Sequence, residues 1–316
     1  MWEKWAENRK VLWEFASFLR FCDENHWTHG CQMSDFKVVQ SSRKNRKFKK
    51  TSKPLIDRDS SPAEVDVPKV LRWDAFEIWC SCNFLSWISM FFRQIENCCQ
   101  QELKNSEFLT NAIELLNQTL QNIEISEVIC LGIGRISECS IARHQLAFIL
   151  IAAKHFKITE IKFFDPVLTE AEKRVLEELG CQVLSDNKEG KYIVEHPTLF
   201  YLPHCPKQIT NNLLFENWTI ESLPSIFLIC NSFQTIIETT PERFLRPNAH
   251  FILEINQFAT EVEIENNFRF TDIFNDFSIH SFAPQNLQSA PQTLWDNKPV
   301  PTYKEEDLEL IKNDGS

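Results

Sequence analysis

Short apolar runs alternate with longer segments of helical periodicity between residues 128 and 255. The runs lack the polar alternation of a strand with one solvated face, so we interpret them as strands covered on both faces of a parallel sheet. Strands are predicted at 128–131, 161–164, 182–184, 199–202, 226–230 and 251–255. Helices are predicted between them at 141–156, 169–179 and 208–218. We expect each helix to cross over from one strand to a parallel neighbour.

The ends of the predicted helix at 169–179 carry their own signals. Thr169 and Glu172 stand three residues apart, which is the spacing of a capping box, and Gly180 follows as a terminator. Two further helical patterns run from Leu71 to about Asn122 and place helices before the first strand. Together these elements predict an α/β fold, with a Rossmann-like doubly wound, mostly parallel sheet, N-terminal helices and disordered tails.

Composition divides the chain into four parts. We predict a tryptophan-rich N-terminal extension at 1–32, a basic disordered tail or linker at 33–70, the α/β domain at 71–283 and an acidic, frayed C-terminal tail at 284–316. The most apolar segment of the first part of the domain, 76–92, is interrupted by Glu77, Asn83 and serines. Because it is also shorter than the roughly 20 residues of a membrane span, we interpret it as a buried amphipathic helix. No membrane partner is expected.

Positive charge is concentrated before the domain. Residues 37–58 contain nine Lys and Arg residues and one acidic residue, whereas the whole chain has a formal charge of −11. The densest block, 43–50, lies among polar residues and is predicted to be unfolded. It is either a nuclear-localisation or nucleic-acid patch or a solvated linker. The acidic domain argues against any other nucleic-acid surface, and we expect the protein in cytoplasm and nucleus.

Cysteine usage indicates the redox compartment. The 316-residue chain has eleven cysteines, none of them in a C-x-x-C pair, and several lie inside apolar runs. Free thiols behave there as small apolar side chains, so a reducing intracellular compartment is favoured over a disulfide framework or a zinc module. The first 25 residues are interrupted by charges and do not form a secretory signal. No metal site is predicted.

The first predicted strand leads into a glycine turn. Gly132 and Gly134 follow Leu131 directly, and such glycines allow main-chain N–H groups to approach a ligand at a helix N-terminus. The third glycine of the dinucleotide motif is replaced by Ser137, and the nearest acidic residue at a strand end is Asp165. NAD is therefore disfavoured. The turn either holds an anion or nucleotide or is simply tight, and Asp165 either binds a ribose or caps the turn before Pro166.

Polar residues follow two other predicted strands, where such sheets bind ligands. His204 and Cys205 stand between two prolines. They could act as base and nucleophile, ligate a metal or haem iron, or fill a rigid turn, and the turn is favoured because neighbours on a strand point to opposite faces. Asn231 and Ser232 follow the strand at 226–230 and either bind a ligand or cap a helix. The candidate cofactors are therefore haem and a nucleotide or adenosyl compound.

These same segments resemble a known family. The matching segments are LGIGRISECSIARHQLA at 131–147, FDPVLTEAEKRVLEELG at 164–180, TLFYLPHCP at 198–206, NNLLFENW at 211–218, CNSF at 230–233 and FNDFSIH at 274–280. As an ordered set they are similar to the SRR-like family, named for plants with sensitivity to red light reduced. The resemblance covers about 127–282, and 33–50 resembles the beginning of such proteins. The family usually has glycine at the position of Cys230, and 1–32 has no counterpart.

The resemblance implies a regulatory protein with an unidentified protein partner or small ligand. The family is associated with circadian clock input and light signalling in plants, and with clock-gene expression and regulation of haem biosynthesis in animals. Its fungal relative is linked to microtubule-related processes. The resemblance supplies no catalytic residue. The alternative is an enzyme, a transferase using S-adenosylmethionine or a nucleotide, because a glycine turn and a strand-end acid are the minimum that such a site needs.

Overall fold

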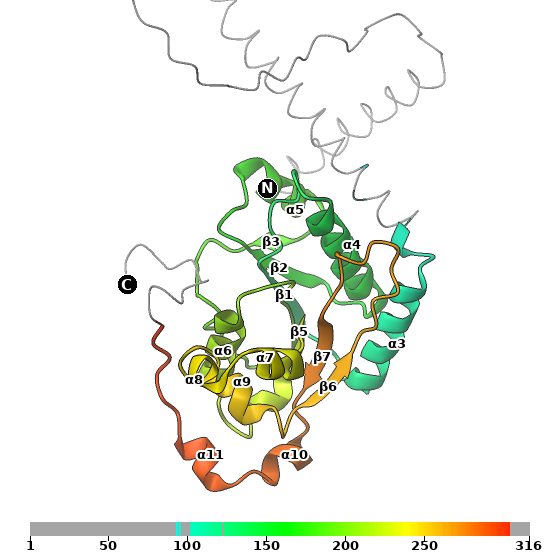
Figure 1. Ribbon diagram of the computed structural model, residues 1–316. Coiled ribbons are helices and arrows are strands. Elements are labelled where there is room, and N and C mark those ends of the chain that lie inside the picture. Colours follow the sequence, from blue (N-terminus) through cyan, green and yellow to red (C-terminus); the bar gives the residue numbers. More distant parts are fainter. Residues whose placement is uncertain (1–92, 94, 96–101, 122, 304–316) are drawn as a thin grey trace, which may run out of the picture. The chain divides into compact units, whose positions relative to one another are not determined.

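A seven-stranded sheet forms the centre of the domain in the computed structural model, which describes residues 93, 95, 102–121 and 123–303 (Figure 1). Its strand order is β3-β2-β1-β4-β5-β7-β6. The strands are β1 (Glu127–Leu131), β2 (Glu160–Phe164), β3 (Gln182–Val183), β4 (Thr198–Tyr201), β5 (Ile226–Asn231), β6 (Thr260–Glu263) and β7 (Phe277–Ser281). The helices are α3 (Glu107–Leu120), α4 (Ser140–His155), α5 (Glu170–Glu178), α6 (Lys207–Glu216), α7 (Phe233–Thr239), α8 (Glu242–Asn248), α9 (His250–Ile255), α10 (Pro284–Gln288) and α11 (Gln292–Asp296).

The sheet is parallel from β3 to β5, and β7 alone runs antiparallel to its two neighbours. β1 pairs with β2 on one side and with β4 on the other. The chain order therefore reverses between β1 and β4. In open α/β sheets this switch point lies beside a crevice at the carboxyl ends of the strands, where ligands bind.

Successive side chains along a strand point to opposite faces of the sheet, so the strands contribute to two separate cores, one on each face. In β1, Val128 and Cys130 belong to the core that includes residues of α3, α4 and α5, whereas Ile129 and Leu131 belong to the core that includes residues of α6 and α9. This arrangement explains the continuous apolar runs of the sequence, because both faces of a central strand are buried. The predicted doubly wound, mostly parallel α/β fold is confirmed.

Most predicted elements are present within one or two residues, including the capping box of α5 between Thr169 and Glu172. The predicted strand at 251–255 is wrong, because these residues form α9. Phe251 and Ile255 are fully buried in that helix, and a short apolar run does not distinguish a buried strand from a buried helix. The sequence interpretation also missed β6 and β7.

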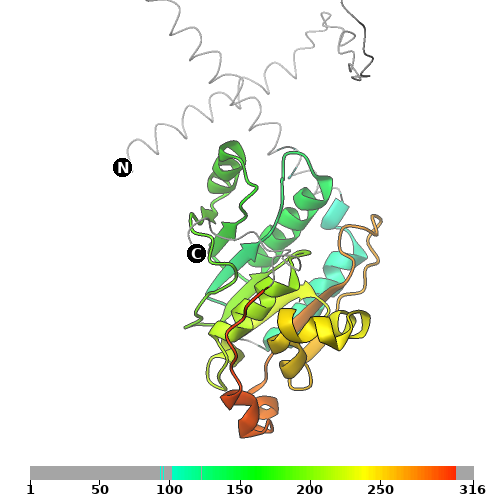
Figure 2. The same cartoon turned by 60° about the vertical axis from the view of Figure 1, so that its left-hand side comes forward.

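The C-terminal boundary of the domain also needs correction. A frayed tail was expected from residue 284, but 284–303 form α10, α11 and an extended segment that returns toward α6 (Figure 2). Leu287 and Leu294 are buried, and Trp218 Nε1 donates a hydrogen bond to the Leu294 carbonyl over 3.0 Å. These apolar anchors fix a segment whose average composition is polar.

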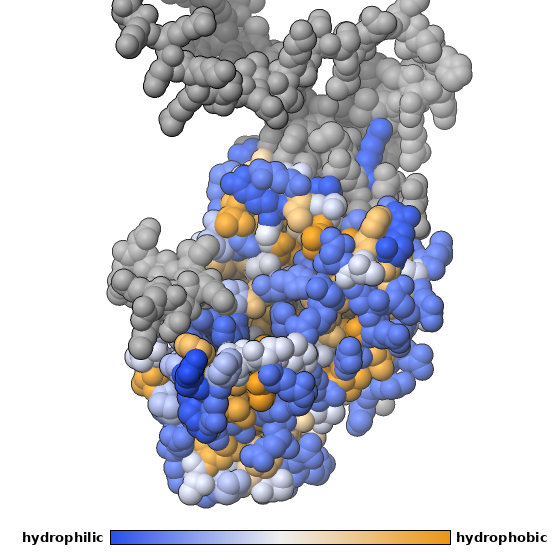
Figure 3. All heavy atoms as spheres, in the orientation of Figure 1, coloured by the Kyte–Doolittle hydropathy of each residue, from blue (hydrophilic) through white to orange (hydrophobic). Residues whose placement is uncertain are grey.

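Several predictions lie outside the described residues. These are the extension at 1–32, the basic segment at 33–70, the helix at 76–92 and the tail from 304 onward. In the part of the chain that is described, no helix has both the length and the apolar character that crossing a membrane requires. On the face shown in Figure 3, apolar residues form small groups among hydrophilic ones.

Candidate functional site

The glycine turn after β1 is held by backbone geometry that favours glycine. Gly132 has φ of +70° and Gly134 has φ of +76°, both in the left-handed region. The Gly132 N–H donates to the Phe164 carbonyl over 3.1 Å. A Cβ atom on Gly132 would lie 2.5 Å from Cys205 Sγ, so the turn also needs a residue without a side chain.

Two carboxylates of the chain itself accept hydrogen bonds from two N–H groups of this turn. Gly134 N–H donates to Asp165 Oδ2 over 2.7 Å, and Ser137 N–H donates to Glu172 Oε1 over 2.8 Å. An anionic ligand would therefore have to displace a bound carboxylate. The arrangement favours a tight, internally neutralised turn over a phosphate cradle, and Gly134 and Ser137 act as donors to the protein rather than lining the adjacent cavity.

Glu172 is the residue that ties this turn to α5. Its side chain is fully buried, and Oε2 accepts hydrogen bonds from the Thr169 N–H and the Thr169 hydroxyl, each over 2.8 Å. Burial raises the pKa of the carboxyl, but the hydrogen bonds from Ser137 and Thr169 outweigh it and the pKa is lowered overall. The capping box was recognisable in the sequence, whereas the bond to Ser137 spans 35 residues and has no local signal.

Asp165 is placed as a turn cap. Besides Gly134, it accepts the Val167 N–H on Oδ1 over 2.9 Å, and only 8% of the residue is exposed. Both carboxylate oxygens thus accept backbone N–H groups, one from the glycine turn and one from the turn at Pro166. This supports the capping interpretation over ribose binding.

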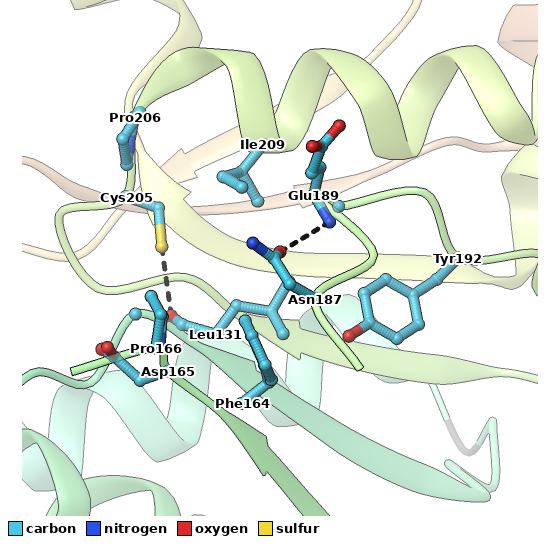
Figure 4. Close-up of a pocket in the computed structure, with 12 residues that line it drawn as sticks. Leu131, Phe164, Asp165, Pro166, Asn187, Glu189, Tyr192, Cys205, Pro206 and Ile209 are labelled. Carbon is cyan, nitrogen blue, oxygen red and sulfur yellow. Dashed lines mark hydrogen bonds between the residues drawn. The ribbon is translucent and has the colours of Figure 1, made fainter. Parts of the chain in front are cut away.

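A cavity of about 160 Å³ opens beside the turn, at the carboxyl ends of β1, β2 and β4, and we call it the glycine-turn cavity (Figure 4). Its lining residues are Leu131, Gly132, Phe164, Asp165, Pro166, Asn187, Glu189, Gly190, Tyr192, Cys205, Pro206 and Ile209. Most of the lining is apolar, and an apolar cavity of about 150 Å³ accommodates benzene. The size and position fit a small ligand that buries one planar ring.

Tyr192 gives this cavity a free polar group. Only 6% of the residue is exposed, and its hydroxyl has no hydrogen-bond partner although it is buried. Figure 4 shows the hydroxyl directed toward Asn187 and Leu131 rather than away from the cavity. Burial, reinforced by Asp186, raises the pKa of Tyr192 to about 12, so the group stays a neutral O–H. The sequence interpretation missed Tyr192 because it lies in an irregular loop without a motif.

Cys205 and His204 do not form a catalytic pair. Cys205 Sγ donates to the Leu131 carbonyl over 3.1 Å, and burial together with nearby Asp165 raises the thiol pKa to about 12. His204 is exposed, has φ of +52° and places its ring 5.3 Å from the ring of Phe277. The geometry supports a rigid turn. A protonated, hydrogen-bonded thiol also does not fit the thiolate ligand that haem iron would need.

A second, more open cavity of about 420 Å³ adjoins the first through Cys205 and Pro206. This His204 cavity is lined by His204, Cys205, Pro206, Lys207, Asn231, Thr235, Ile236, Thr239, Thr240 and Asp276. Asn231 Nδ2 donates to Asp276 Oδ2 over 3.0 Å at its rim. The structure therefore brings together three predicted site residues, namely His204, Cys205 and Asn231, from the ends of two strands.

The remaining predicted residue, Ser232, caps a helix. It is 7% exposed, and its hydroxyl accepts the Thr235 N–H over 3.0 Å at the start of α7. Cys230, which stands where glycine was expected, is buried within β5 and lies 3.5 Å from His280 Nδ1. Its position is inside the sheet rather than in a turn. Among the described residues, no three His, Cys, Asp or Glu side chains converge as metal ligands.

The fold and the site together define the class of this protein. It is an α/β protein with ligand-sized cavities at the switch point of its sheet. Residues 99–281, more than half of the chain, match the SRR1 domain. The chain is 34% identical over 226 residues to an SRR1-like protein of Drosophila melanogaster, covering 71% of this chain and 79% of that protein. It is 32% identical over 190 residues to the Arabidopsis thaliana protein SENSITIVITY TO RED LIGHT REDUCED 1, covering 58% and 66%. The chain belongs to the SRR1 family.

Solved structures with a similar course of the chain include two methyltransferases. The SAH-bound Podospora anserina methyltransferase PaMTH1 has a TM-score of 0.33 and 10% identity, covering 71% of this chain and 100% of that one. The 23S rRNA methyltransferase ErmE has a TM-score of 0.32 and 11% identity, covering 58% and 71%.

Proposed function

We propose that this SRR1-family protein is an intracellular regulatory protein that binds a small, planar ligand in the glycine-turn cavity. The processes proposed for it are circadian clock input, clock-gene expression and regulation of haem biosynthesis. The name of the Arabidopsis relative, which refers to red-light sensitivity, supports a role in responding to environmental signals. In this proposal the ligand changes the contacts that the carboxyl edge of the sheet offers to a protein partner.

The unpartnered Tyr192 hydroxyl carries the proposal. A buried polar group without a partner costs about 1–3 kcal/mol, and proteins rarely keep one without a reason. Tyr192 lines a mostly apolar cavity at the switch point, next to Asn187. A ring-shaped ligand with one hydrogen-bonding edge would satisfy the hydroxyl while its face packs on apolar residues such as Phe164 and Ile209.

Replacing Tyr192 with phenylalanine tests this role. We expect the full-length protein to bind a nucleotide or adenosyl compound with submillimolar affinity in calorimetric titration, and Tyr192→Phe to weaken that binding about tenfold through one lost hydrogen bond. The melting temperature of the ligand-free variant should not fall, because the change removes an unsatisfied group.

Tyr201→Phe is the matched control. The Tyr201 hydroxyl is also buried and unpartnered, but Tyr201 belongs to the opposite core and does not line the cavity. Its replacement should leave ligand affinity unchanged. Equal affinity of Tyr192→Phe and the parent protein for every bound compound would refute the assignment of the hydroxyl.

The alternative function is a transferase that uses S-adenosylmethionine or a nucleotide. The shared wall of the glycine-turn and His204 cavities favours it, because a transferase must hold two reactants side by side. In that case the His204 cavity would hold the acceptor. His204→Ala should then abolish product formation and leave binding of the donor compound intact, whereas absence of any product with the parent protein argues for the regulatory function.

The basic segment supports a proposal for localisation. Six basic residues lie within 43–50, flanked by serines and a threonine, which suits an import receptor and tuning by phosphorylation. We propose that the protein distributes between cytoplasm and nucleus. A fluorescent fusion with these six residues changed to alanine should lose its nuclear pool, and unchanged nuclear entry would identify the segment as a solvated linker.

A further inference from the structure

A third cavity at the same edge of the sheet has an acidic lining. It measures about 380 Å³ and adjoins the His204 cavity through Thr235 and Asp276. The residues of this acidic cavity are Ser232, Gln234, Thr235, Asn256, Glu261, Glu263, Asp276 and Ser278. It lies where β6 ends and β7 begins, away from the glycine turn.

Negative charge in this cavity is not balanced by its lining. Glu261, Glu263 and Asp276 contribute carboxylates, and no Lys or Arg lines the cavity. The Glu261 side chain accepts the Gln234 N–H over 3.1 Å. Burial raises the Glu261 pKa, but hydrogen bonds from His280 and Ser232 outweigh it and lower the pKa to about 2. Glu261 is therefore ionised at neutral pH.

His280 is the one possible cation in contact with Glu261 among the described residues. Its Nε2 lies 3.4 Å from Glu261 Oε2 and also 3.4 Å from the Phe233 N–H, which donates to it. The nitrogen can donate to the carboxylate only when protonated and can accept from Phe233 only when it is not. When it accepts from Phe233, the charge of Glu261 has no cationic partner.

Ser278 supplies the second, independent observation. The residue is fully buried in β7 and lines the acidic cavity, yet its hydroxyl has no hydrogen-bond partner. In the β6–β7 pairing Ser278 stands opposite Glu263, and His280 stands opposite Glu261. Because directly paired residues point to the same face of a sheet, the Ser278 hydroxyl and both glutamates share one face. An ionised carboxylate only accepts hydrogen bonds and a hydroxyl can accept as well, so a donor group is the one partner that all three side chains share.

The chemistry of the missing group follows from these positions. A metal ion is disfavoured, because no three potential ligands converge among the described residues. A guanidinium group carries five donors in one plane and matches a single carboxylate bidentately, whereas an ammonium group offers three donors that rotate about one bond. Two carboxylates from β6 and one hydroxyl from β7 provide three acceptors, which match the three N–H donors of an ammonium group.

We propose that the acidic cavity binds a primary ammonium group carried on an alkyl chain, with Glu261, Glu263 and Ser278 as its hydrogen-bond partners. The ammonium belongs either to a free aliphatic amine or to a lysine side chain of a partner protein. This site is separate from the glycine-turn cavity and does not depend on the ligand proposed there.

Titration of the full-length protein with putrescine tests the site. We expect saturable binding, and we expect Glu263→Gln and Ser278→Ala each to weaken it about tenfold. Glu265→Gln is the matched control, because it removes the same charge from an exposed residue two positions away that does not line the cavity. A peptide containing one lysine forms the second arm, and tighter binding of either probe identifies the source of the ammonium group.

Two further probes, one without the positive charge and one without N–H groups, show whether the site requires a charged hydrogen-bond donor. Butane-1,4-diol lacks the charge and tetramethylammonium lacks N–H donors, so neither should bind. The proposal is overturned when tetramethylammonium binds as well as putrescine, when Glu265→Gln weakens binding as much as Glu263→Gln, or when putrescine shows no saturable binding. Since Glu263 is exposed and Ser278→Ala removes only an unpartnered hydroxyl, both variants are expected to fold.

Discussion

Glu172→Ala is expected to destabilise the protein by about 3–5 kcal/mol, because it removes a fully buried carboxylate and leaves three partly buried donors without their acceptor. The lost bonds are those from the Ser137 N–H, the Thr169 N–H and the Thr169 hydroxyl. They join the glycine turn to the start of α5, so both elements should loosen together. Urea unfolding of the full-length variant and parent at pH 7 measures the difference.

The difference in unfolding free energy between Glu172→Ala and the parent protein should be smaller at acidic pH. The Glu172 pKa is lowered from its ordinary value of 4.5 in the folded protein, so its stabilisation is fully present above that value and is lost as pH falls through the folded pKa. Glu170→Ala is the control, since Glu170 is exposed on the same helix and pairs with Lys173 at the surface over 2.7 Å. A similar unfolding midpoint for both variants would show that the buried carboxylate does not hold the turn.

Gly190→Ala is expected to destabilise the protein by about 3 kcal/mol and to abolish ligand binding at the glycine-turn cavity. The residue has φ of +83°, and a Cβ atom there would lie 2.4 Å from the Ile209 carbonyl oxygen in α6. The left-handed conformation costs about 1–2 kcal/mol for a residue with a side chain. The contact with helix backbone adds about 1–3 kcal/mol, because it cannot be relieved by a side-chain rotation.

Ligand binding should be lost because the loop that contains Glu189 and Gly190 is held against α6 by hydrogen bonds. Asn212 Nδ2 donates to the Glu189 carbonyl over 2.7 Å, and the Tyr303 hydroxyl donates to Asn212 Oδ1 over 2.6 Å. Pushing Gly190 away from α6 breaks this chain of bonds and displaces the cavity wall. Gly180→Ala has a similar φ of +85° but no atom within 4 Å of the added Cβ, so only the strain should remain. Equal losses in thermal stability for the two variants would contradict the steric argument.

The sequence predicted the central sheet well because its strands are buried on both faces. β1 and β5 contain the apolar runs VICL and IFLIC, which is the pattern of a strand that is covered on both faces. β7 reads FSIHS, and its Ser278 and His280 are fully buried despite their polarity. A local pattern does not reveal polar residues that are buried by tertiary contacts, so this strand was missed.

The candidate site was predicted only in part, because a local sequence pattern does not reveal contacts between residues that are far apart in the chain. Gly132, Asp165 and Cys205 were identified from strand-end positions and do line one cavity. Glu172 was identified only as part of the capping box, and its bond to Ser137 was missed because the two residues are 35 positions apart. Tyr192 was missed because it lies in an irregular loop without a motif. The glycine turn illustrates the limit, since the N–H groups that suggested an anion site are occupied by carboxylates 31 and 35 residues away.

A ligand-bound crystal structure tests the central claim most directly. The full-length protein would be crystallised with the small molecule that it retains from cells, identified by native mass spectrometry, or with a nucleotide or adenosyl compound that it binds. We predict a planar group between Phe164 and Ile209, with a polar atom within about 3 Å of the Tyr192 hydroxyl. A ligand seated at the opposite edge of the sheet, in the cavity lined by Phe227 and Phe282, with the glycine-turn cavity empty, would contradict the account.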